Sequence, residues 1–141
     1  MSLANPYYVG LQNVGSYQVS GVPYATSSII APASSSTPVE VGFPDTTQRI
    51  FVSNINTQPL RVGFSSNGVK GTNYFIIPAA TLSTAFPTQE LKVKVSSIFL
   101  LSHTATAASA SIFAELTNID TNLLLNSGPS GSNWSGSVGV G

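Results

Sequence analysis

His103 is the chain's one histidine and therefore its first candidate for acid–base or metal chemistry. A lone histidine cannot supply a cluster of histidine metal ligands, and a catalytic triad would have to bring a serine and a carboxylate to it from elsewhere. Asp45, Asp120 and many serines are present, but the Gly-x-Ser-x-Gly elbow that exposes a catalytic serine is absent. We interpret His103 as an ordinary loop residue and predict that the chain has no catalytic residue and is not an enzyme.

The carboxylates are too dispersed along the chain to indicate a site. No two are adjacent, and none have the spacing of a calcium loop. A glycosidase needs two facing carboxylates, and the sequence favours no pair. We predict surface ion pairs or charges at hairpin ends, with no metal site and no cofactor. The five residues are Glu40, Asp45, Glu90, Glu115 and Asp120.

The basic residues are too few for nucleic-acid binding, which requires enough positive charge to neutralise phosphates. Lys92 and Lys94 share one face of a predicted strand, and Lys70 lies in a predicted hairpin loop. We interpret them as charges that discourage pairing at sheet edges. The segment from Asn67 to Thr72 lacks the spacing of a phosphate-binding loop. We expect neither a nucleic-acid partner nor a small-molecule substrate.

Large aromatic residues in otherwise polar end segments are a different kind of signal. Trp134 lies in a Gly/Ser-rich stretch, and Tyr7 and Tyr8 lie near the N-terminus. Burying such a side chain stabilises by about 2–3 kcal/mol, so it rarely stays in solvent. Trp134 can fold back on its own domain or anchor the tail on a neighbour, and we favour the neighbour. The same argument applies to the two tyrosines.

The composition favours a subunit of an assembly. The 141 residues fit one domain, there is no cysteine, and the net charge is zero. Only 7% of the residues are charged, against about 25% in ordinary domains. A surface of serine, threonine, asparagine and small apolar residues suits burial against neighbours. The alternative is a secreted-type β domain, although the N-terminus lacks the features of a signal peptide.

Short apolar runs rich in β-branched and aromatic residues alternate with turn residues, which is typical of an all-β sandwich or barrel. About eight antiparallel strands are expected. An immunoglobulin-like sandwich is the main competitor, but its Cys–Trp–Cys core signature is absent. The predicted strands are Ser16–Val22, Ser28–Ala31, Val39–Phe43, Arg49–Asn54, Leu60–Ser65, Asn73–Ile77, Glu90–Ser102 and Ala110–Leu116.

Two strand regions carry more specific predictions. In the first, Leu60, Val62 and Phe64 should face the core, and the following Asn67-Gly68 predicts a tight hairpin turn. The second contains four consecutive apolar residues, which must be covered on both faces of the sheet or lie at a subunit contact. These four residues are Ile98, Phe99, Leu100 and Leu101.

The residue composition divides the chain into three parts. Residues 1–15 are predicted to form an extended N-terminal arm, because proline and glycine there disfavour a helix. Residues 16–119 contain the strands and form the predicted domain. Residues 120–141 form a Gly/Ser-rich C-terminal tail.

The stretch of residues 48–119 resembles the small single jelly-roll proteins of large icosahedral DNA viruses. The resemblance is a pattern of strands and hairpins rather than a catalytic signature. It is carried by Arg49-Ile50-Phe51-Val52, by the run from Pro59 to Val69, by Gly71-Thr72-Asn73-Tyr74-Phe75, by Ile98-Phe99-Leu100-Leu101-Ser102 and by the run from Ser111 to Ile119.

The resemblance implies a single jelly-roll β-sandwich that forms the penton, a homopentamer at the five-fold vertices of a capsid. Its partners would be the major and minor capsid proteins, and it would be made in the host cytoplasm and located in the virion. The family has no catalytic or cofactor-binding residues to transfer. The expected assembly contacts are Tyr7, Tyr8, Ile98, Phe99, Leu100, Leu101 and Trp134.

The alternative function is a head-decoration or attachment domain of a phage or virus, often trimeric, that binds a glycan or another receptor. Such a domain would need exposed aromatic residues on its loops, for which Tyr24, Tyr74 and Trp134 are candidates. Oligomeric symmetry separates the two functions.

Overall fold

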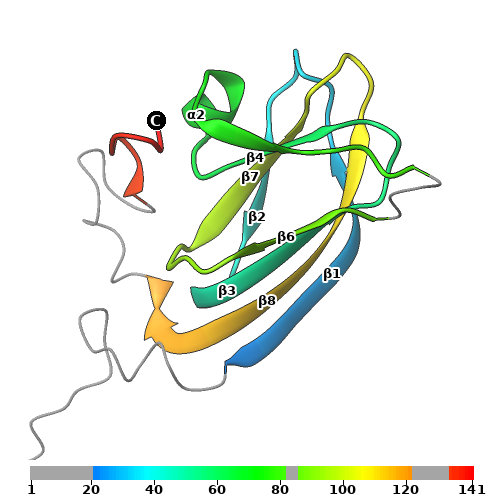
Figure 1. The fold of residues 1–141 in the computed structure, drawn as a ribbon. Helices are drawn as coiled ribbons and strands as arrows, with labels where there is room; N and C mark the ends of the chain where they lie inside the picture. The colour runs from blue at the N-terminus through cyan, green and yellow to red at the C-terminus, as the bar shows by residue number, and fades with distance from the viewer. Residues whose placement is uncertain (1–20, 82–85, 122–133) are drawn as a thin grey trace, which may run out of the picture.

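The computed structural model describes residues 21–81, 86–121 and 134–141, without the side chain of Asn118. The described residues form eight strands and one short helix, and the strands lie in two four-stranded sheets packed face to face (Figure 1). Every neighbouring pair of strands is antiparallel. The predicted antiparallel all-β sandwich is confirmed.

The first sheet, here called sheet A, has the strand order β1-β8-β3-β6. The second, sheet B, has the order β2-β7-β4-β5, with helix α2 between β4 and β5 in the chain. Sheet A consists of β1 (Val22–Ala31), β8 (Ala108–Asp120), β3 (Asp45–Asn54) and β6 (Thr88–Leu91). Sheet B consists of β2 (Val39–Gly42), β7 (Ser97–Ser102), β4 (Leu60–Gly63) and β5 (Tyr74–Ile77), and α2 spans Ser66–Lys70.

The core lies between the two sheets and follows the alternation of the strands. Ile50 and Val52 of β3 face Leu60 and Val62 of β4 across the sandwich, and all four are fully buried. Phe64 packs against the same core. The predicted inward positions of the strand that begins at Leu60 are therefore confirmed, because side chains alternate between the two faces of a strand.

Strand β1 differs from the prediction of two short strands. It is continuous from Val22 to Ala31 and includes Pro23. Proline is tolerated because β1 is an edge strand of sheet A, so a missing N–H on the open side breaks no ladder. The pairing with β8 shifts between Thr26 and Ile29, where Ser28 has a φ of 61°. Residues 16–20 of the predicted first strand lie outside the described residues.

The predicted Asn67-Gly68 hairpin turn is wrong, although the two strands it was expected to join do pair. Leu60 opposes Ile77, and the connection contains helix α2. Ser65 begins this helix because its hydroxyl oxygen accepts a hydrogen bond from the Gly68 N–H at 2.9 Å. A capping serine outweighs the local preference of Asn-Gly for a tight turn.

The predicted long strand Glu90–Ser102 is interrupted. Strand β6 ends at Leu91 and β7 begins at Ser97, so the chain crosses from sheet A to sheet B in between. Thr47 of β3 holds this crossing. Its hydroxyl donates to the Val93 carbonyl at 2.7 Å and accepts from the Val95 N–H at 3.1 Å. Lys92 and Lys94 therefore lie on a connection rather than on a strand.

Helix α2 packs against β4 and β7 on the outer face of sheet B. Gly63 permits this close approach, because a Cβ there would lie 3.0 Å from the Val69 side chain. Val69 is fully buried, and so is Leu101, whose cross-strand partner Arg61 places it on the same outer face. Ile98 and Leu100 are buried on the inner face. Within the single chain, β7 is covered on both faces of the sheet.

Replacing Leu101 with alanine tests this covering. We expect L101A to lower the free energy of unfolding by about 2–5 kcal/mol, because it empties a fully buried site beneath α2. Urea denaturation measures the effect. The control is I76A on β5 of the same sheet, where the side chain is 44% exposed and the loss should be clearly smaller. Equal losses in the two variants would mean that α2 does not cover Leu101 in solution.

Candidate assembly surfaces

The structure places the predicted assembly contacts in very different environments. Tyr7 and Tyr8 lie outside the described residues. Three residues of β7 have no exposed surface: Ile98, Leu100 and Leu101. The chain itself covers them, so they do not need a neighbouring subunit for their burial. Phe99 is half-buried on the outer face of sheet B, opposite Glu40 of β2. Of the β7 run, Phe99 is the residue with surface left for a partner.

Trp134 is half-buried against its own domain. The indole N–H donates to the Lys94 carbonyl oxygen at 2.6 Å, and the Lys94 ammonium lies 5.4 Å from the ring centroid. The ring also packs on the hydrophobic core. In the single chain the indole therefore folds back, contrary to the preference for a neighbouring subunit. Both the carbonyl and the ammonium group belong to Lys94, on the crossing between β6 and β7. The sequence alone did not indicate that this crossing lies near Trp134.

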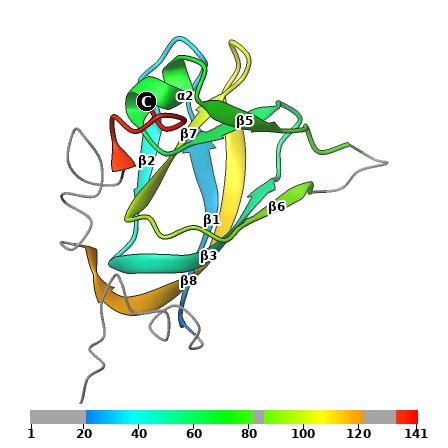
Figure 2. The same ribbon diagram turned by 60° about the vertical axis from the view of Figure 1, so that its left-hand side comes forward.

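The last described residues, 134–141, form a C-terminal strap beside α2 (Figure 2). The Ser65 hydroxyl donates to the Val140 carbonyl at 2.8 Å, and so links the strap to the residue that caps the helix. Gly68 lies directly beneath, since a Cβ at this position would collide with the Val140 carbonyl oxygen. The strap therefore requires glycine at this position of α2.

His103 is hydrogen-bonded to Arg61. Arg61 donates from Nε to His103 Nδ1 at 3.1 Å, and its guanidinium lies 4.5 Å from the centroid of the Tyr74 ring. In a catalytic triad the carboxylate accepts a hydrogen bond from the Nδ1–H group. Here a cation donates to that nitrogen, which is the opposite arrangement. The group fixes Arg61 on the outer face of sheet B.

The carboxylates of sheet A form the kind of surface ion pairs that were predicted. Arg49 Nε lies 3.3 Å from Glu90 and 3.7 Å from Glu115. All three side chains are partly exposed, so these pairs contribute little to stability. In the described part of the chain no three histidine or carboxylate side chains gather as a metal site would require.

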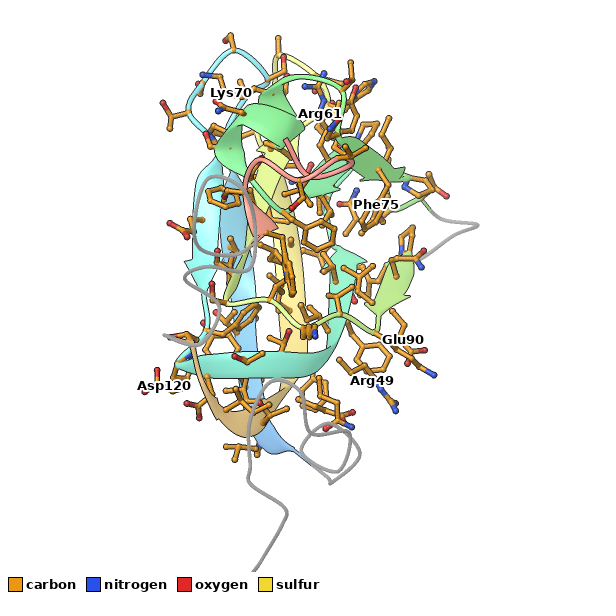
Figure 3. The ribbon with its side chains drawn as sticks, turned by 90° about the vertical axis from the view of Figure 1, so that its left-hand side faces the viewer. Arg49, Arg61, Lys70, Phe75, Glu90 and Asp120 are labelled. Carbon is orange, nitrogen blue, oxygen red and sulfur yellow. The ribbon has the colours of Figure 1, made fainter. Side chains whose placement is uncertain are left out.

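Charge is divided unevenly between the two halves of the sandwich. The strands of sheet A carry four of the five carboxylates and one of the five basic residues. Sheet B, α2 and the β6–β7 connection carry the remaining four basic residues and one carboxylate. Figure 3 shows Arg61 and Lys70 near α2, and Arg49, Glu90 and Asp120 at the opposite end. Lys92 and Lys94 line the same surface hollow as Arg49 of β3, so the charge difference between the two halves is smaller than the strands alone suggest.

The outer face of sheet A also exposes apolar surface. Phe113 is 40% exposed, and its ring centroid lies 6.0 Å from that of Phe51 on the neighbouring strand. Ile30 of β1 is 67% exposed on the same face. The alternation of side chains along the last predicted strand already placed Phe113 on the face that points away from the core. Its pairing with Phe51 depends on the β3–β8 register, which no local pattern reveals.

Comparisons with protein-family models, with curated proteins and with solved structures found no match for this chain. No helix in the described part of the chain is long and apolar enough to cross a membrane. The strand order and the surfaces of the sandwich thus carry the functional argument.

Removing the indole tests the fold-back contact of Trp134. We expect W134A to lower the free energy of unfolding by roughly 1–3 kcal/mol, because it removes half-buried apolar surface and one hydrogen bond. The control W134F keeps most of the ring and loses the N–H donor, so its loss should be smaller. Chemical denaturation of the full chain measures both. Wild-type stability in W134A would mean that the strap is not packed on its own domain.

Proposed function

We propose that the chain is a structural subunit of an icosahedral virus capsid, folded as a single jelly roll and assembled as a homopentamer at the shell vertices. Its partners would be further copies of itself and the major and minor capsid proteins, and its location the virion. The strand order of the two sheets is the observation that carries this proposal.

A jelly roll can be described as a long antiparallel ribbon wrapped into two sheets, so that the first strand pairs with the last and the middle two pair with each other. The observed antiparallel pairs are β1 with β8, β2 with β7, β3 with β6, and β4 with β5. Wrapping adds the contacts of β3 with β8 and of β4 with β7. This scheme supports the jelly roll over an immunoglobulin-like sandwich.

The filled interior favours a structural role among the functions that jelly rolls serve, which include capsid, lectin and cupin domains. A fold alone does not decide function, so the site must. The inward positions are occupied by fully buried apolar side chains such as Val62, Leu100 and Ala110. The space between the sheets is thus filled by a packed core, which does not favour a ligand-binding cavity there.

The surface supports assembly. With only ten charged side chains in 141 residues, little of the surface is committed to strongly hydrated groups. Among the described strands, β1 and β6 end sheet A and β2 and β5 end sheet B, and neighbouring subunits can approach at such edges. A closed ring of identical copies uses two different patches on each subunit, which suits a sandwich whose two outer faces differ in composition.

Native mass spectrometry of the purified full chain tests the proposal. We expect a species of five times the 14.6 kDa chain mass, which persists on dilution into the micromolar range. A trimer would favour the decoration or attachment function instead. A monomer at every concentration, absent from purified particles, would contradict the proposal.

A further inference from the structure

We infer that the C-terminal strap, residues 134–141, is exchanged between copies of this chain, so that the strap of one subunit docks beside α2 of the next. The docking surface consists of α2 and the β6–β7 connection, residues 92–96, and is called the strap site. The inference rests on the proposed homo-oligomer and names one contact by which a subunit would hold its neighbour.

The strap is a folded unit in its own right. Backbone hydrogen bonds join its residues to one another: the Ser137 N–H donates to the Trp134 carbonyl at 3.0 Å, and the Val140 N–H donates to the Ser137 carbonyl at 3.0 Å. The strap belongs to neither of the two sheets. It can therefore change subunits without breaking a strand pair and without losing its own shape.

The strap site recognises the strap through groups that every copy presents. The Lys94 carbonyl accepts from the indole N–H of Trp134 at 2.6 Å, and the Ser65 hydroxyl donates to the Val140 carbonyl at 2.8 Å. Gly68 leaves room for that carbonyl on α2 (Figure 2). Exchange between identical copies replaces each of these contacts with the same contact, which makes it a low-cost route to an oligomer.

The backbone is strained at the point where the chain enters the docked strap. Trp134 has a φ of 65°, in the left-handed region that a bulky side chain disfavours. The φ angle sets the direction from which the preceding residues reach the strap. A strap that arrives from a neighbouring copy enters from a different direction, which frees Trp134 from this turn. Strained connections of this kind favour exchange.

The strap does not fill the apolar groove that it covers. An open hollow of about 360 Å³ remains between the strap and the domain. Protein interiors are packed with few such voids, so docking within one chain leaves apolar surface that a subunit contact can cover. The apolar lining of the hollow comes from Phe64, Val93 and Val95 of the domain and from Trp134 and Val140 of the strap.

The chain between Thr121 and Trp134 is long enough to reach an adjacent copy. An extended chain spans at most about 3.3–3.6 Å per residue, so these thirteen steps reach up to about 43 Å. A folded chain of this length has a radius of gyration of about 14 Å and is thus about 37 Å across. The reach is therefore about one subunit width, which suits contact between neighbours in a ring.

Isotope mixing with a crosslinker distinguishes exchange from docking within one chain. The chain has no cysteine, so S135C introduces a single thiol beside Trp134, and the Lys94 ammonium lies 5.4 Å from the indole ring. Equal amounts of isotope-labelled and unlabelled S135C chain are refolded together from urea and treated with a short thiol–amine crosslinker. Exchange predicts that about half of the crosslinked peptide pairs combine a labelled with an unlabelled chain, because neighbours in the ring are drawn at random. Docking within one chain predicts none.

The control is the same measurement in W134A with S135C. The mixed pairs should fall at least threefold, because the indole supplies apolar surface and the N–H contact of the docked strap. V138C, at a fully exposed position of the strap, repeats the measurement if S135C does not fold. The chain's three lysines, Lys70, Lys92 and Lys94, all lie on the strap site, so a crosslink to any of them reports docking.

Native mass spectrometry and circular dichroism verify that each variant assembles and folds. An oligomer that gives only like-labelled pairs, or mixed pairs that persist in W134A, would overturn the exchange while the oligomer still supports the proposed function. A wild-type chain that is a monomer at every concentration would overturn both.

Discussion

The structure depends on the burial of β7 from both sides. Ile98 and Leu100 face the core between the sheets, and Leu101 lies beneath helix α2. A strand that is apolar on both faces needs a cover on its outer side, and in this chain α2 provides it. Gly63 lets the helix approach the sheet closely enough to do so.

The same helix organises the C-terminal strap. Ser65 caps α2 with its hydroxyl oxygen and donates the hydroxyl proton to Val140, so one side chain links sheet B, helix and strap. Gly68 leaves room for the Val140 carbonyl above the helix. With Trp134 held on Lys94, the tail becomes part of the folded domain. The buried apolar residues of β7 are therefore covered by the chain itself, whereas Ile76 of sheet B and Phe113 and Ile30 of sheet A remain exposed.

The alternation of side chains predicted much of the fold, because inward and outward positions follow from local pattern. Leu60 and Val62 were placed in the core, and the apolar run of β7 was recognised as needing two covers. The hairpin turn predicted at Asn67-Gly68 was wrong, because capping by Ser65 and burial of Val69 favour a helix there. The break between β6 and β7 was also missed, because Thr47, which fixes it, is distant in sequence.

The candidate surfaces were the hardest part to predict. The outer surface of each sheet is assembled from strands far apart in the chain, so its side chains are brought together in a way that appears only once the strand order is known. Trp134 was recognised as a residue that must be buried, but its partner at Lys94 depends on the crossing between the sheets. Residue type indicated which side chains needed contacts, and the topology determined where those contacts lie.

The central claim is that this sandwich is a vertex subunit whose copies join into a closed ring of five. A symmetry-resolved electron cryomicroscopy map of the purified oligomer tests it most directly. The account predicts five-fold symmetry, with each copy contacting its two neighbours through different patches. A two-fold or three-fold assembly would contradict it.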